Sequence, residues 1–403
     1  RMTIFFKKTV LTTLCASSLL LSACGGDGNS GDYTSRTDKK TFTVDADVSN
    51  VANVHDVFTY KMPSVQNKEI TATTLVFTPK GTPPIGGWPI VVWAHGTVGA
   101  ADKCAPSKNP LTGVEKNIIT ALLQKGYAVI APDYEGLGNS DVAHPFLNLS
   151  SAAKSVIFAV DGVNKRYANL SKNWSVIGWS QGGHAALAAA EFSSVLNPSG
   201  YQFKGTVAIA PASYLQDTLD LAQQAAQSYA DAGRLDQAVP IAAKVYTYAA
   251  IVASGIKARQ TDFTYDQAFL ATKVSLASKA ETVCSPELGE AFGLDIQTTL
   301  ATNGGNYSLY QALQPDYKTN ANIVRYVVEN NPGQLKINKP VYIYQGTADT
   351  TVPYPITHDK LYAKMLDKGT DVHFIAKSGD DHQTIMEDNI AELADQVNTL
   401  MTQ

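Results

Sequence analysis

Three residue types that together can perform acyl transfer occur along this chain in the order Ser, Asp, His. Residues 178–183 read Gly-Trp-Ser-Gln-Gly-Gly, a G-x-S-x-G pattern that follows an apolar run and precedes an Ala-rich one. This pattern is typical of a sharp strand-to-helix turn that exposes the serine oxygen, and its glycines let strand and helix approach without a Cβ clash. We therefore predict that Ser180 is a nucleophile.

A serine hydroxyl is a weak nucleophile, so it needs a base and an acid that orients the base. Asp349 follows the apolar run 341–344, and His382 follows the apolar run 371–376. Both would lie in loops at the carboxyl ends of strands, where the partners of such a serine are found. We predict that His382 takes the serine proton and that Asp349 orients the imidazole.

The negative charge that develops on a substrate oxygen needs preorganised backbone N–H donors. Gln181 opens the helix after the nucleophile, so its N–H is the first candidate. The second is expected in the His-Gly-Thr turn after 89–94, where the donor is either Thr97 or Gly96. The carboxylates in 133–135 precede the nucleophile, and we expect them in a structured loop beside the site.

These residues need a scaffold, and the chain alternates short β-branched runs with longer helical patterns. This alternation indicates an α/β fold whose mostly parallel sheet is buried on both faces by helices. Strands are predicted at 55–62, 69–78, 89–94, 127–131, 174–178, 205–210, 340–344 and 371–376. The first two should be antiparallel edge strands. Helices are predicted at 113–125, 151–167, 181–192, 355–368 and 382–401.

One segment breaks the alternation, because residues 213–338 contain no predicted sheet strand. A connection of this length needs its own structure, and its Ala, Gln and Tyr residues recur at helical spacing. We predict a helical cap inserted before the penultimate core strand, with the core formed by 54–212 and 339–403. The nearly uncharged segment 242–252 is either a buried cap helix or a lid whose apolar face meets lipid or substrate.

The N-terminus has the pattern of an export signal. Lys7 and Lys8 precede an uncharged, mostly apolar stretch that ends in Leu-Ser-Ala-Cys at Cys24. This ending resembles the lipobox of bacterial lipoproteins, so we expect residues 1–23 to be removed and Cys24 to be lipidated. The alternatives are an ordinary signal peptide and a buried helix. Residues 24–53 would form a tether, and Gly25 after the cysteine favours the outer membrane.

Cys104 and Cys284 remain once Cys15 leaves with the signal and Cys24 carries lipid. An even pair in an oxidising compartment favours a disulfide, with two free thiols as the alternative. A metal site is not expected, because isolated cysteines lack the His or Cys neighbours that zinc spacing requires.

The composition excludes several classes of protein. A chain of 403 residues with 44% hydrophobic and 17% charged residues is too apolar to be disordered. A net charge of −4 without a basic block provides no footprint for nucleic acid. We expect a monomer that needs no cofactor and contacts the membrane through its lipid anchor.

Together, these motifs resemble the secretory lipase family of α/β-hydrolases, the yeast lipase A type, here as a bacterial lipoprotein. The resemblance rests on residues 93–96, 102–107, 133–136, 178–183, 346–349 and 381–382 and on the long helical insertion. It implies lipase or esterase activity on an ester or lipid substrate, a cap over the acyl pocket, and a disulfide between the Cys104 loop and the cap. That last implication supports the pair Cys104 and Cys284.

The sequence thus predicts an exported, lipid-anchored serine carboxylic ester hydrolase, located in the bacterial cell envelope or secreted. The alternatives are a serine peptidase of the same fold and a non-catalytic surface binding lipoprotein. Acyl chain length depends on the shape of the cap pocket, so the sequence does not specify it.

Overall fold

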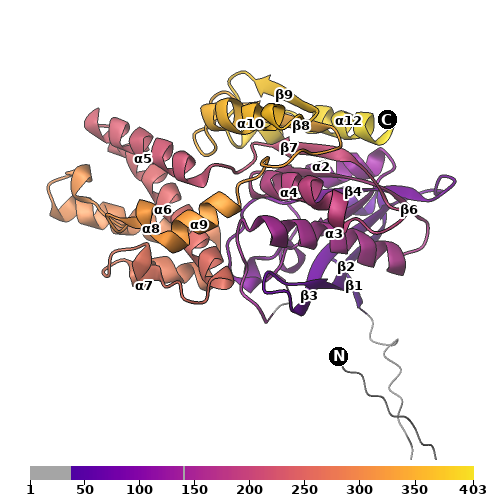
Figure 1. Ribbon diagram of the computed structural model, residues 1–403, viewed down its shortest axis with the longest axis horizontal. Helices are drawn as coiled ribbons and strands as arrows, with labels where there is room; N and C mark the ends of the chain where they lie inside the picture. The colour runs from indigo at the N-terminus through magenta and orange to yellow at the C-terminus, as the bar shows by residue number, and fades with distance from the viewer. Residues whose placement is uncertain (1–37, 139–140) are drawn as a thin grey trace, which may run out of the picture. The chain divides into compact units, whose positions relative to one another are not determined.

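The computed structural model describes residues 38–138 and 141–403 (Figure 1). The predicted signal peptide 1–23 and the lipidation site Cys24 lie outside these residues.

Nine strands of the described chain form one sheet in the order β1-β2-β3-β5-β4-β6-β7-β8-β9. Strands β1 to β3 pair antiparallel, and β3 meets β5 antiparallel, whereas β4 to β9 pair parallel. Their bounds are β1 Lys39–Thr41, β2 Ala52–Pro63, β3 Glu69–Pro79, β4 Trp88–Ala94, β5 Ala128–Pro132, β6 Leu170–Trp179, β7 Gln202–Ile209, β8 Val341–Gly346 and β9 Val372–Lys377. The predicted α/β-hydrolase sheet is therefore present.

Helices cover both faces of this sheet, as its continuous apolar runs require. On one face, α3 (Leu149–Arg166) and α4 (Gln181–Leu196) bury Val156 and Ala185 against the strands. On the other face, α2 (Gly113–Gln124) and α12 (Ile390–Met401) bury Ile119 and Val397. The helices thus bury both faces of the sheet, and the candidate site lies at the carboxyl ends of its parallel strands.

The N-terminal boundary of the fold differs from the prediction. The sequence predicts a tether over 24–53, but within it β1 pairs with β2 and α1 (Ala46–Ser49) packs on the core. β1 therefore takes the edge of the sheet, and β2 is an inner strand. The short run around Lys39 is charged, so its pattern conceals the strand, while Phe42 and Val48 provide the buried anchors.

One predicted C-terminal helix is divided, and the other is continuous but partly π-helical. The predicted helix 355–368 starts at Tyr354, includes the π-helical segment η7 (Ile356–Tyr362) and continues without a break as α10 (Ala363–Asp367). The predicted helix 382–401 forms α11 (Thr384–Glu387) and α12. Asn389 separates them, because its side chain donates to the carbonyl oxygen of Ile385 at 3.0 Å and ends α11.

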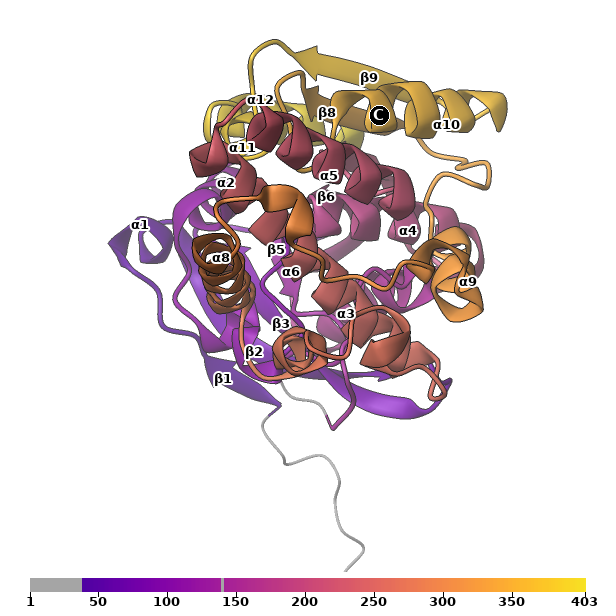
Figure 2. The ribbon, with the colours of Figure 1, turned by 90° about the vertical axis from the view of Figure 1, so that its left-hand side faces the viewer.

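The insertion between β7 and β8 forms a helical cap with its own hydrophobic core. Its main helices, which Figure 1 shows together at one end of the sheet, are α5 Leu215–Asp231, α6 Leu235–Arg259, α7 Val274–Ala277, α8 Ser285–Thr302 and α9 Ala321–Glu329. Figure 2 views the cap end on, with α6 between α5 and α8. α6 is apolar and long enough to cross a membrane, but 72% of its apolar window is buried inside the protein.

A disulfide joins the cap to the core. Cys104 ends the short 3₁₀ helix η1 (Asp102–Cys104) of the core, and Cys284 is the N-cap residue of α8. Their sulfur atoms are bonded, with Cα atoms 5.5 Å apart, across 180 residues of sequence. The pairing implied by the family resemblance is therefore present.

Candidate active site

Ser180 lies in a strained turn between β6 and α4. Its backbone takes φ 60° and ψ −115°, values that a serine rarely adopts. The start of the helix approaches the neighbouring strand closely at this turn, because a Cβ on Gly182 would lie 1.8 Å from the carbonyl oxygen of Ala94. A Cβ on Gly178 would lie 2.1 Å from the carbonyl oxygen of Gly182. The glycines are therefore steric requirements of this turn.

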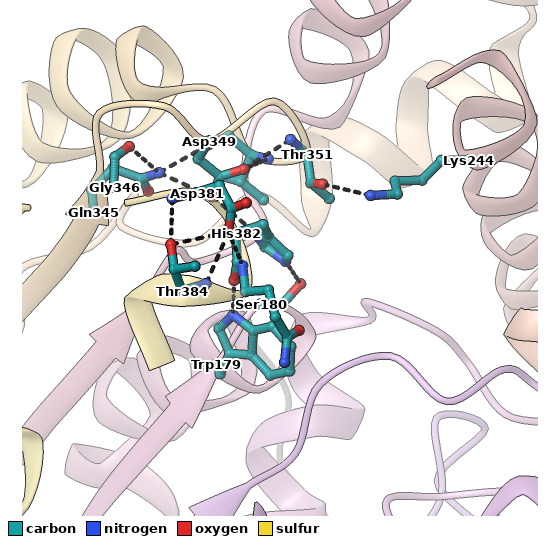
Figure 3. A network of polar contacts seen from close by, with 12 residues as sticks. Trp179, Ser180, Lys244, Gln345, Gly346, Asp349, Thr351, Asp381, His382 and Thr384 are labelled. Atoms are coloured by element: carbon teal, nitrogen blue, oxygen red, sulfur yellow. Dashed lines mark hydrogen bonds and ion pairs between the residues drawn. The ribbon is translucent and has the colours of Figure 1, made fainter. Parts of the chain in front are cut away.

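The structure brings Ser180, His382 and Asp349 into one chain of hydrogen bonds (Figure 3). Nε2 of His382 lies 2.9 Å from Oγ of Ser180, and its Nδ1 lies 2.8 Å from Oδ2 of Asp349. Ser180 lies directly after β6, His382 in the loop after β9 and Asp349 in the loop after β8. With Nδ1–H donating to Asp349, Nε2 can accept the serine proton, which is the arrangement that general-base activation requires.

The carboxylate of Asp349 is fully buried and held by fixed donors. Its Oδ1 accepts the N–H groups of Thr351 and Val352, both at 2.8 Å. Its Oδ2 accepts Nε2 of Gln345 at 3.2 Å, and the same amide also donates to the carbonyl oxygen of Val352 at 2.9 Å. Sequence reasoning missed Gln345; the alternation along β8, which turns this side chain inward, is the signal that could have found it.

His382 is also held from outside the chain of hydrogen bonds. Nε1 of Trp179 donates to the carbonyl oxygen of His382 at 3.0 Å, and the indole and imidazole centroids lie 5.3 Å apart. The preceding residue, Asp381, accepts the N–H groups of Gln383 and Thr384, each at 2.8 Å. These two N–H groups lower the pKa of Asp381.

The predicted oxyanion donors lie around Ser180. Gln181 opens α4, and Thr97 lines the same cavity as Ser180. Gly96 packs against the indole of Trp179, where a Cβ would lie 3.1 Å from the ring. The second donor remains either Thr97 or Gly96.

The turn that carries Gly96 and Thr97 starts at His95, which belongs to a stack of buried rings. His95 and Tyr134 stack with centroids 4.3 Å apart, and the Tyr134 hydroxyl donates to the carbonyl oxygen of His95 at 2.8 Å. His144 follows in the stack, and its Nε2 lies 3.0 Å from Nε2 of Gln181. Burial lowers the pKa of His95 and lowers that of His144 to about 4, so both rings are neutral at neutral pH.

The carboxylates of 133–135 are engaged in structural contacts. Asp133 accepts the N–H of Ser107 at 2.9 Å, while Glu135 accepts the N–H of Val65 at 2.8 Å. Burial raises the pKa of Asp133 to about 7 and raises that of Glu135. Their loop supports the site from beside it, as the sequence predicts.

An apolar cavity of about 150 Å³ opens at Ser180. Cap helices α5 and α6 form most of its wall through side chains such as Leu215, Leu219 and Val245. Tyr248 of α6 also lines it, and burial, with a smaller contribution from the negative charge of Asp349, raises the pKa of this phenol to about 12. Within residues 38–138 and 141–403, no cluster of three or more His, Cys, Asp or Glu residues could hold a metal ion.

Comparisons with known proteins relate part of the sequence to one family and the fold to solved structures. Residues 103–236, which include Ser180, match the secretory lipase family. Candida antarctica lipase A in its closed state is 17% identical, with 90% of this chain and 81% of that chain covered and a TM-score of 0.67. The ligand-bound rice cell wall degrading esterase LipA from Xanthomonas oryzae is 19% identical, with 90% and 97% covered and a TM-score of 0.66.

At these identities the two structures establish the fold. No protein with a curated description matches the sequence. The chain therefore has the α/β-hydrolase fold of these structures, and residues 103–236 are similar to the secretory lipase family.

Proposed function

We propose that the protein is a serine carboxylic ester hydrolase that works through an acyl-enzyme on Ser180. The observation that carries the proposal is the unbroken chain of hydrogen bonds from Ser180 through His382 to Asp349, at 2.9 and 2.8 Å. The apolar cavity beside the serine supports an acyl substrate, because it offers hydrocarbon walls and few polar groups.

Each residue has one role in the proposed reaction. Oγ of Ser180 attacks the ester carbonyl while Nε2 of His382 takes its proton, and Asp349 stabilises the imidazolium that forms. The backbone N–H groups of Gln181 and of Thr97 or Gly96 stabilise the oxyanion. His382 then returns the proton to the leaving alcohol. Water next attacks the acyl-enzyme while His382 takes its proton, and that proton returns to Oγ of Ser180 as the carboxylic acid is released.

Hydrolysis of 4-nitrophenyl acyl esters by the full chain in detergent tests this proposal. Ser180→Ala should lower kcat by more than about 1,000-fold. Asp349→Asn should lower it by about 10⁴-fold, because the asparagine favours the wrong tautomer of His382. Ser175→Ala, at a buried serine five positions earlier on β6, is the matched control and should keep full activity.

Three results would reject the proposed activity. Equal rates for the wild type and Ser180→Ala would exclude Ser180 as the nucleophile. Amides hydrolysed as fast as esters of the same acyl group would point to a peptidase, and failure of a fluorophosphonate to label Ser180 would point to a binding protein. A series of acyl chain lengths with the wild type would then define the substrate range.

We also propose that the enzyme is exported and anchored by lipid on Cys24. The family match supports export, and the Leu-Ser-Ala-Cys pattern supports lipidation. In a Gram-negative host, Cys24→Ser should abolish incorporation of a labelled fatty acid and move the protein out of the membrane fraction. Cys15→Ser, within the signal, is the control and should stay lipidated; fatty-acid labelling of Cys24→Ser would contradict the anchor.

A further inference from the structure

We propose that cap helix α8 is part of the oxyanion-hole scaffold. Its first residue, Ser285, and its N-cap residue, Cys284, hold the segment 97–99 and thereby fix the N–H group of Thr97. This inference rests on the proposed function with Thr97, of the two candidates, as the second donor, and it assigns the cap a role in positioning that donor in addition to covering the substrate.

Three contacts join the start of α8 to this segment. The N–H of Ser285 donates to the carbonyl oxygen of Val98 at 2.9 Å, and its Oγ donates to the carbonyl oxygen of Thr97 at 3.4 Å. Gly99 and Cys284 form an isolated antiparallel bridge. The disulfide to Cys104 adds a covalent bond at the same point, so segment and helix form one unit.

Gly99 makes this close pairing possible. Its φ of 125° lies where L side chains are strained, and a Cβ there would lie 3.0 Å from the backbone nitrogen of Ser285 and 3.1 Å from Cα of Cys284. The two backbones therefore approach closely enough to bond directly.

The other end of the donor segment is held by the core. Tyr134 fixes the carbonyl of His95, and the indole of Trp179 packs against Gly96. The peptide of Thr97 thus lies between one fixed point in the core and one in the cap. Donors held in this way stabilise the transition state without reorganisation, so loosening one end should lower kcat while KM changes little.

Ser285→Pro removes one link without disturbing the helix. Proline is favoured at the first position of a helix, and the φ of −82° and ψ of 165° at Cys284 suit the residue before proline. The variant loses the N–H that binds Val98, whereas Ser285→Ala loses only the hydroxyl contact. Ala321→Pro places the same substitution at the first residue of α9, away from segment 97–99, and serves as the matched control.

For Ser285→Pro we expect kcat to fall by about 10- to 100-fold, since a donor displaced by about 1 Å loses much of its effect. KM should stay within about twofold of the wild type, because the uniform binding of the acyl group is unchanged. A trifluoromethyl ketone, which forms a tetrahedral adduct with the serine, should bind more weakly by the same factor as kcat falls. Ser285→Ala should lower kcat less, and Ala321→Pro should match the wild type.

A folded Ser285→Pro with wild-type kcat would overturn the inference, as would a change confined to KM. Should circular dichroism show that this variant is unfolded, the double variant Cys104→Ala/Cys284→Ala, which cuts the covalent link at the same point, takes its place with the same expectations. A wild type that neither hydrolyses esters nor reacts with a fluorophosphonate would instead refute the proposed function itself.

Discussion

At the scale of single residues, the candidate triad depends on side chains that take no part in proton transfer. The Asp349 carboxylate has no exposed side-chain surface, so every acceptor site must be matched by a protein donor. Gln345 is one of these donors, and it also binds the carbonyl of Val352, so a single amide fixes both the carboxylate and its loop.

Gln345→Leu should therefore weaken catalysis and stability together. The substitution leaves a buried carboxylate short of one donor, which should lower the free energy of unfolding by about 1–3 kcal/mol. We also expect kcat to fall by about tenfold. Ester kinetics and urea unfolding measure the two effects. Gln396→Leu, which removes a partly buried amide that binds Tyr344 away from the site, is the control; equal losses in the two variants would contradict the assigned role.

Among the described residues that line the cavity, Lys244 is the only charged one, and it extends from α6 toward Thr351 (Figure 3). Its ammonium donates to Oγ1 of Thr351 at 3.2 Å and forms no ion pair within the described residues. A cation at this place should favour esters of anionic alcohols.

We expect Lys244→Met to reduce the preference for 3-carboxyphenyl over 3-carbamoylphenyl butanoate by about fivefold, which corresponds to about 1 kcal/mol for an exposed charge pair. The ratio of kcat/KM for the two esters measures it. Lys360→Met, at a lysine that pairs with Asp217 instead of lining the cavity, should leave the ratio unchanged. An unchanged ratio in Lys244→Met would contradict the expected role of the charge.

At the scale of elements, helix α4 carries Ser180 at its N-terminal end and holds the returning cap segment along its length. His184 lies with Nε2 2.9 Å from the carbonyl oxygen of Asn330, and Glu191 accepts the N–H of Gly333. Burial raises the pKa of Glu191 to about 7. One helix thus positions the site and anchors the exit of the cap.

This anchor should make stability depend on pH. The pKa of Glu191 is about 7 in the folded chain and about 4.5 for a free carboxyl, so the folded state binds this proton more tightly. The resulting stabilisation, about 3 kcal/mol, is complete below about pH 4.5 and is lost as pH rises through 7. Burial also raises the pKa of Asp133, which adds to the pH dependence of stability. The contribution of Glu191 must therefore be measured as the difference between the wild type and a variant at position 191.

Glu191→Gln keeps an acceptor oxygen but cannot ionise. Between pH 5 and pH 8, the wild type should lose about 3 kcal/mol of unfolding free energy relative to this variant. Urea unfolding at four pH values in that range measures the difference. Glu329→Gln, at an exposed carboxylate on α9, should follow the wild type at every pH, and parallel curves for Glu191→Gln and the wild type would contradict the role of Glu191.

The elements that the sequence predicts well are those whose signal is local. The strands of the parallel sheet, the glycines of the elbow and the long insertion each follow from short-range patterns, and Ser180, Asp349 and His382 fall at the strand ends that those patterns define. β1 was concealed because its short charged run has no apolar alternation. The contacts of Ser285 and Glu191 join distant segments, so only the folded chain reveals them.

At the scale of the whole molecule, the described part of the chain joins the cap to the core covalently at three places. Its chain enters after β7 and returns before β8, and the disulfide adds a third attachment at the start of α8. A loop of 180 residues closed by a disulfide restricts the unfolded chain strongly.

Cys104→Ala/Cys284→Ala should therefore lower the free energy of unfolding by about 3–5 kcal/mol. Urea unfolding without reductant measures the loss. Wild-type protein whose disulfide has been reduced should unfold at the same urea concentration as the variant. A variant as stable as the oxidised wild type would show that the bond leaves the unfolded chain unrestricted.

The disulfide also determines what a protease can achieve. A cut at any exposed bond between residues 104 and 284 leaves one piece with Cys104 and the other with Cys284, still joined by the sulfur bridge. Ser180 can then lie on either piece, depending on the place of the cut, while Asp349 and His382 always stay on the second. Without a reductant, a nicked molecule therefore remains one covalent unit that keeps Ser180, Asp349 and His382 together.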